Sequence, residues 1–167
     1  MDRVIAVVDN EVITYSELLR EARVALVKRE GEQIAGADLG AELLASFLDY
    51  LINQTMIAAR ARRVGGVEVS EQDVDREAAR FAQRFRTPAA YQAFLRRFDI
   101  SEEVLRDTLR RDLRSERYIQ DRLRAWRVDA GDADATAAAV KRMAQEMREG
   151  VELRVLGPSD ELELQSP

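Results

Sequence analysis

The feature that most constrains this chain is a strand-like segment close to its C-terminal end. In "GVELRVLG" (residues 150–157), three aliphatic residues alternate with Glu152 and Arg154. A period of two residues is typical of a strand that is buried on one face. Because an isolated strand leaves its backbone amide and carbonyl groups without partners, this segment requires a second strand. Only "VIAVV" (residues 4–8), at the opposite end of the sequence, offers a complementary segment of sufficient length.

Between these two segments the sequence is typical of helices. Apolar residues recur at helical spacing, and Thr14, Asp38, Ser70, Thr87, Ser101 and Asp134 are candidate N-caps. We therefore predict a mainly α fold of about six helices, with a small β-sheet formed by the N-terminal and C-terminal strands. A turn at Asp9-Asn10 and a short return strand at Val12-Ile13 precede the first helix. The predicted helices cover residues 15–29, 38–64, 70–85, 87–98, 101–126 and 134–149.

The composition excludes several kinds of chemistry. The 167 residues include no cysteine and no histidine, which rules out disulfides, Cys/His zinc sites and histidine-dependent catalysis. No glycine motif for phosphate binding and no calcium-loop spacing occurs. The net charge is −5 and acidic residues are interleaved with the arginines, so no basic field would attract nucleic acid. We expect no enzymatic activity, no cofactor, no metal, no nucleic-acid partner and no direct insertion into a membrane.

Apolar side chains remain as the candidate binding surface. Aromatic residues on three successive predicted helices, together with methionines, could line a groove for extended apolar peptides, since the flexible thioether adapts to varied partners. Taken one at a time, these residues are expected to pack in the core, and only some of them would line a groove. Met56 suits the same role. The candidate peptide-binding residues are Phe47, Tyr50, Phe81, Phe85, Tyr91, Phe94, Phe98, Met143 and Met147.

Three blocks of sequence, taken in order, resemble the SurA family of periplasmic chaperones. Residues 2–22 ("DRVIAVVDNEVITYSELLREA") are similar to the start of the mature family sequence, with an apolar strand, an Asp/Asn turn, "VIT" and an "SEL" helix entry. Residues 48–82 resemble the next block, which contains a "GVEVSEQDVD" turn. Residues 91–123 resemble the third, in which a short helix and a break precede a long helix. Together the blocks cover most of residues 2–127.

The resemblance also implies how the chain is divided. The family usually continues into one or two parvulin-type prolyl isomerase domains, whose active sites normally carry histidines, and this chain has none. Residues 138–156 resemble the family's C-terminal segment, in which a helix and a strand return to the N-terminal domain. We expect a SurA-like N-terminal chaperone domain at residues 1–127 and a short linker at residues 128–134, where isomerase domains would be inserted. A returning helix and strand at residues 135–156 and an acidic tail at residues 157–167 complete the chain.

The family resemblance implies an ATP-independent chaperone that binds unfolded or extended polypeptides, such as outer-membrane protein precursors, without isomerase activity of its own. Such clients carry exposed strands of alternating apolar and polar residues. The implied location is the periplasm, with the signal peptide not present in this chain. The alternative is a structural or adaptor module that binds one partner or forms a homodimer, in which residues 135–156 swap into a neighbouring copy. A further alternative is an isomerase whose catalytic domain lies outside this chain.

Overall fold

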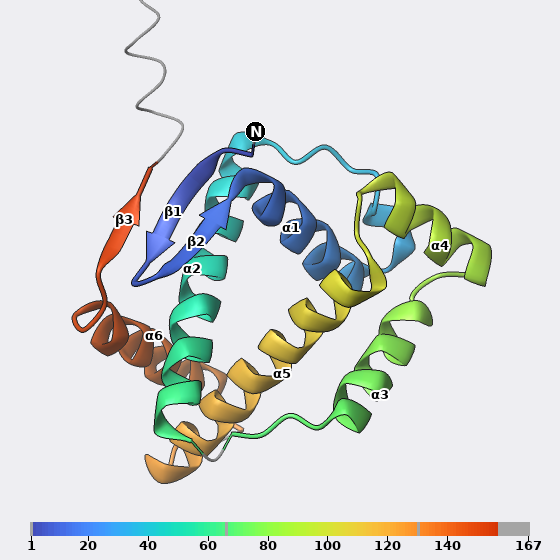
Figure 1. Ribbon diagram of the computed structural model, residues 1–167. Coiled ribbons are helices and arrows are strands. Elements are labelled where there is room, and N and C mark those ends of the chain that lie inside the picture. The colour runs from blue at the N-terminus through green and yellow to red at the C-terminus, as the bar shows by residue number, and fades with distance from the viewer. Residues whose placement is uncertain (1, 66, 130, 157–167) are drawn as a thin grey trace, which may run out of the picture.

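Figure 1 shows the fold in a computed structural model, and the structure describes residues 2–65, 67–129 and 131–156. Within them lie six α-helices and one three-stranded sheet, which confirms the predicted mainly α class. The predicted acidic tail lies outside the described residues. The elements are β1 (Val4–Val8), β2 (Glu11–Thr14), α1 (Tyr15–Glu30), a 3-10 helix η1 (Glu32–Ile34), α2 (Ala41–Val64), α3 (Glu71–Ala82), α4 (Pro88–Arg97), α5 (Glu102–Ala125), α6 (Ala133–Arg148) and β3 (Leu153–Val155).

The sheet joins segments from opposite ends of the sequence. Its strand order is β2-β1-β3, and both pairings are antiparallel. Residues 6–8 lie opposite residues 153–155, and the Leu156 N–H donates to the Ile5 carbonyl oxygen at 2.8 Å. The predicted pairing of the two terminal strands is therefore confirmed, as the blue and red arrows of Figure 1 show.

Strand β3 is less buried than its alternating pattern predicts. Val151 and Leu153 are half-buried against the sheet and helix α2, but Val155 is 48% exposed. The reason is its position: β3 is short and lies at the edge of the sheet, where neighbours cover it on one side only.

Asp9, in the turn between β1 and β2, forms hydrogen bonds that hold the segment before β3 against the sheet. Its backbone is in the left-handed region, with a φ of 52°. The Asp9 N–H donates to the Glu152 carbonyl oxygen at 2.8 Å, and the Asp9 carboxylate accepts from the Glu152 N–H at 3.1 Å. The same carboxylate accepts from Arg63 of α2 at 2.8 Å. One side chain therefore ties the hairpin to the segment before β3 and to the end of α2.

Most helices begin where the capping signals predict. Thr14, Ser70, Thr87 and Ser101 are N-caps, and each side chain accepts a hydrogen bond from the backbone N–H three residues later. At Ser70 the arrangement is reciprocal, because the Asp73 carboxylate also accepts from the Ser70 N–H.

Two predicted caps are wrong. Helix α2 begins after Gly40 and not at Asp38, because Arg23 donates to the carbonyl oxygens of Ala35 and Ala37 and holds the preceding segment outside the helix. Helix α6 begins after Asp132 and not at Asp134: the Asp132 carboxylate accepts from the Ala135 N–H at 2.9 Å. Either Asp132 or Asp134 can serve as an N-cap, and a helix that begins after Asp132 gains additional backbone hydrogen bonds.

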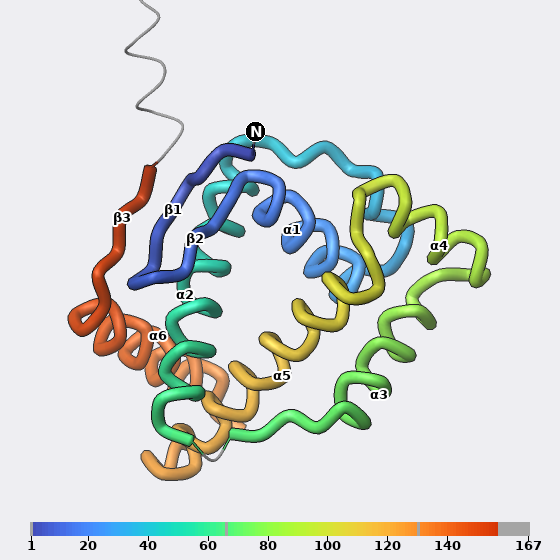
Figure 2. The backbone as a smooth tube through the Cα atoms, viewed as in Figure 1, coloured from blue at the N-terminus to red at the C-terminus, as the bar shows by residue number. Residues whose placement is uncertain are grey.

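The helices gather around α2 and α5, which pack against each other (Figure 2). Helix α6 contacts both α2 and α5, on the side of the molecule that carries β3. Helix α3 packs on α5, and α4 lies beyond α3 at the far end from α6. One apolar cluster lies between the sheet, α1 and α2, and a separate one lies at the α3–α4 end. The fold therefore has one end formed by the sheet with α1 and α2, and another formed by α3 and α4, each with its own apolar cluster.

Charged and polar side chains bridge α1 and α5, and we name this set the α1–α5 seam. Lys28 donates to the Asp112 carboxylate at 2.8 Å and lies 3.7 Å from that of Glu77. The Thr108 hydroxyl donates to Glu21 at 2.7 Å. Burial raises the pKa of Glu21, although its ion pair with Arg111 opposes that shift. The seam consists of Glu17, Glu21, Lys28, Thr108, Arg111 and Asp112.

Candidate functional site

The candidate aromatic residues of α3 and α4 and their flanks pack on one another at one end of the molecule. Phe81, Phe85 and Phe94 are buried, with ring centroids 5.2 to 5.9 Å apart. Tyr91 and Phe98 are partly buried against the same cluster. The structure thus unites five of the candidate residues, and a direct role for them in peptide binding stays a prediction.

The two candidate residues of α2 lie elsewhere. Phe47 is half-buried against the apolar cluster beneath the sheet, and Tyr50 is 41% exposed. Neither belongs to the aromatic cluster of α3 and α4. The nine predicted residues therefore do not form one continuous surface.

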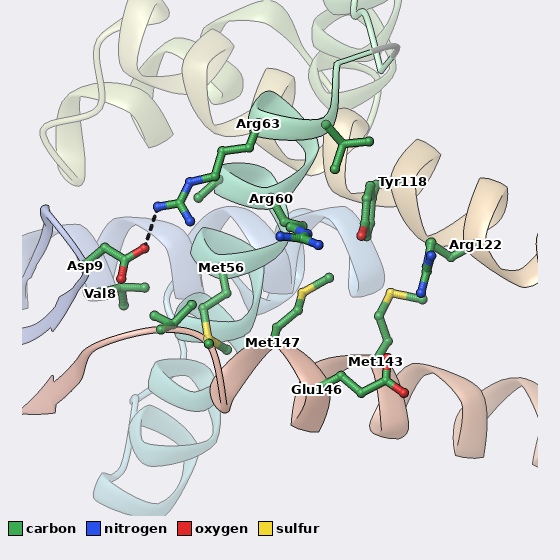
Figure 3. A pocket seen from close by; sticks show the side chains of 14 residues that line it. Val8, Asp9, Met56, Arg60, Arg63, Tyr118, Arg122, Met143, Glu146 and Met147 are labelled. Carbon is green, nitrogen blue, oxygen red and sulfur yellow. Dashed lines mark hydrogen bonds and ion pairs between the residues drawn. The ribbon is translucent and has the colours of Figure 1, made fainter.

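A pocket of about 390 Å³ lies between α2, α5, α6 and the end of β1 (Figure 3). Met56, Met143 and Met147 line it; the first two are only 2% exposed and the third is half-buried. In Figure 3 the two methionines of α6 extend toward α2 and α5. The structure therefore brings together the three methionines that the sequence identified as suitable for a groove.

Helical periodicity explains why these side chains converge. Residues four apart lie on the same face of a helix, so each helix presents a pair of side chains to the pocket. The pairs are Met56 and Arg60 of α2, Tyr118 and Arg122 of α5, and Met143 and Met147 of α6. Val8 of β1 and Val151 close the remaining side, so the chain ends complete the pocket wall.

Sequence reasoning missed Tyr118, Val8 and the arginines of the pocket. Most of the residues next to Tyr118 in the sequence are charged or polar, so the local pattern does not predict that Tyr118 is buried. The available signal is that Tyr118 is next to Ile119 and close to Leu123 and Trp126, where apolar residues gather at the C-terminal end of α5.

The acidic residues of the pocket already have partners. Asp9 accepts a hydrogen bond from Arg63 at 2.8 Å, and Glu146 accepts one from Arg142, also at 2.8 Å. Arg60 is exposed and forms no hydrogen bond or ion pair with any residue that the structure describes. Counting only the described residues, the pocket therefore holds at least one cation without a counter-charge.

Arg122 is a second cation in the pocket without an acidic partner among residues 2–65, 67–129 and 131–156. Its guanidinium carbon lies 4.8 Å from the centroid of the Trp126 ring, a cation–π contact. Its Nε atom is buried and has no hydrogen-bond partner there. An unpaired buried donor is energetically costly, and the positive charge of this guanidinium is not balanced by an acidic side chain among the described residues.

The arrangement favours non-covalent binding. The pocket volume lies within the range of about 300–1,000 Å³ typical of ligand sites. In the described part of the chain no cluster of histidine, cysteine, aspartate or glutamate could hold a metal ion. None of the helices described here has the length and apolar character that crossing a membrane requires.

Comparison with known families identifies the N-terminal part of the chain. The model of the SurA N-terminal domain matches residues 1–124, which include every element from β1 to almost the end of α5. That domain is the non-catalytic part of SurA, and the SurA family is periplasmic. No curated protein matches the chain. Because the match covers well over half of the 167 residues, the chain belongs to the SurA N-terminal domain family.

Proposed function

We propose that this protein is an ATP-independent periplasmic chaperone that holds unfolded or extended polypeptides, including outer-membrane protein precursors, without isomerase activity of its own. The observation that carries the proposal is the methionine-lined pocket, which the returning helix α6 and the end of β1 complete. Family membership supports a chaperone-like role.

Methionine suits a site that must accept many sequences. Its unbranched, polarisable side chain can repack around different apolar groups. The second edge of β3 also faces away from the rest of the sheet, and an extended client could add a strand there. Both contacts depend on general features of unfolded chains, namely apolar side chains and backbone groups.

The contacts are weak enough for release without ATP. Burial of one large apolar side chain contributes about 1.5–3 kcal/mol, whereas a dissociation constant of 1 mM already requires about 4 kcal/mol. A single pocket therefore holds one segment only briefly. A client is retained when several of its segments bind in turn, and it leaves when it folds or inserts elsewhere.

The test is suppression of aggregation. An outer-membrane protein precursor is diluted out of urea, and light scattering is followed with and without a stoichiometric amount of this protein. We expect suppression by the wild type, less by Met147→Glu, which places a charge in the pocket, and unchanged suppression by Val104→Glu, an exposed position of α5 outside it.

Failure of the wild type to reduce scattering would overturn the proposal. Tight retention of a single partner at fixed stoichiometry, with no suppression, would favour the adaptor alternative. A prolyl isomerisation assay on a short peptide should give the uncatalysed rate, and a faster rate would contradict the non-catalytic part of the proposal.

A further inference from the structure

We propose that the pocket selects a bulky apolar side chain that is followed or preceded, two residues away, by an aspartate or glutamate, and that Arg60 binds this carboxylate. The inference rests on the proposed function and adds a sequence preference to it. The occupant is a segment of an extended client chain.

The charge balance of the pocket carries this inference. Five charged residues line the pocket. Asp9 is paired with Arg63, Glu146 is paired with Arg142 outside the pocket, and Arg60 and Arg122 have no acidic partner among the described residues. An entering lysine would meet two cations and no open carboxylate. An entering carboxylate would neutralise Arg60 and benefit from the field of Arg122, in a recess where solvent screens less than at a flat surface.

The spacing follows from strand geometry. The methionines and Tyr118 form the apolar part of the pocket, and the exposed Arg60 of α2 lies between Arg63 and Met147 in Figure 3. A client side chain that enters the apolar part and a carboxylate that meets Arg60 must project from the same side of the extended chain. Side chains alternate between the two sides of an extended chain, so the nearest group on the same side is two positions away, about 7 Å, and we assign this spacing to the pair.

Polyanions do not fit this site as well as a peptide does. The protein carries a net charge of −5, which repels nucleic acid, and half of the pocket is apolar. A single carboxylate beside an apolar side chain satisfies both parts of the pocket at once.

The experiment uses labelled peptides of one extended scaffold, in which the central triplet is Phe-Ser-Glu, Phe-Ser-Gln, Phe-Ser-Lys or Ala-Ser-Glu. Fluorescence anisotropy gives the dissociation constants for the whole chain. We expect the Glu peptide to bind about three- to fivefold more tightly than the Gln peptide, as for a partly exposed ion pair. The Lys peptide should bind more weakly than either, and the preference should shrink at high salt.

Two variants assign the preference to one residue. Arg60→Gln should equalise the Glu and Gln peptides without changing the affinity for the Gln peptide. Arg84→Gln is the matched control, because Arg84 is also exposed and without a partner in the described residues but lies outside the pocket. It should leave the preference intact.

The outcomes separate this inference from the proposed function. Two results overturn the inference alone: equal binding of the Glu and Gln peptides, or a preference for the Glu peptide that survives Arg60→Gln. Both presuppose that the Phe peptides bind and that the Ala-Ser-Glu peptide binds more weakly. If none of the four peptides binds, the inference falls, whereas the proposed function is decided separately by the suppression of aggregation.

Discussion

Replacement of Lys28 by methionine should destabilise the protein because it leaves Asp112 of the α1–α5 seam, and the neighbouring Glu77 of α3, without this cation. The Lys28 ammonium lies 2.8 Å from Asp112 and 3.7 Å from Glu77. Although burial opposes it, the Asp112 carboxylate raises the pKa of Lys28. Methionine keeps the apolar stem of the side chain and removes the ammonium group with its charge and its hydrogen bond to Asp112.

The magnitude follows from the partial burial of the pair. The side chains of Lys28 and Asp112 are 24% and 12% exposed. Breaking a fully buried pair costs about 3–5 kcal/mol, and an exposed pair contributes about 0.2–1 kcal/mol, so we expect a loss of about 2 kcal/mol. With a urea dependence of about 2 kcal/mol per molar, the unfolding midpoint should fall by about 1 M in urea titrations followed by circular dichroism.

The double variant Lys28→Met/Asp112→Leu is the control. It removes both members of the pair and leaves no buried carboxylate at that position, so most of the lost stability should return. A double variant as unstable as the single one would mean that packing, and not charge, explains the loss.

The dependence on pH gives a second readout. Burial raises the pKa of Glu116, and Lys28 is the neighbour that lowers it. Without Lys28 this pKa rises further. A carboxyl whose pKa is raised in the folded state stabilises the protein at low pH and loses that contribution as pH rises through the folded pKa. The loss in Lys28→Met should therefore be smaller at pH 5 than at pH 7, and an equal loss at both would refute the reasoning.

Two further predictions concern the core and the sheet. Phe81→Ala should lower the free energy of unfolding, measured in urea titrations, by about 3–5 kcal/mol, because Phe81 is 2% exposed and packs on three other rings. A loss below about 1 kcal/mol would show that the aromatic cluster is loosely packed. Asp9→Ala should speed hydrogen exchange of the β3 amides while leaving those of α5 unchanged, with a loss of about 1 kcal/mol, and uniform acceleration would contradict a local role.

Local chemistry made much of the fold predictable. The β1–β3 pairing could be inferred because only two long segments in the chain have strand-like composition, and the caps at Ser70, Thr87 and Ser101 are decided by hydrogen bonds that span three residues. The cap at Asp38 failed because Arg23, from another helix, fixes the backbone before α2. Contacts between distant segments are not contained in a local pattern.

The same limit applies to the site. The four-residue spacing of Met143 and Met147 is visible in the sequence, and it places both on one face of α6. Helical spacing alone does not say whether a ring faces the core, as Phe81 does, or solvent, as Tyr50 does. The unpaired state of Arg60 depends on which acids reach the pocket after folding, and no sequence pattern encodes that.

The pairing of β1 with β3 has a consequence for biosynthesis. Asp9 and Glu152 are 143 positions apart, so β1 is synthesised before every helix in the described residues and its neighbour β3 after them. Closing so large a loop is slow compared with forming helices. During that interval the edge of β1 that later pairs with β3 is open, and the pocket lacks its α6 wall, so both features depend on the last part of the described chain to be synthesised.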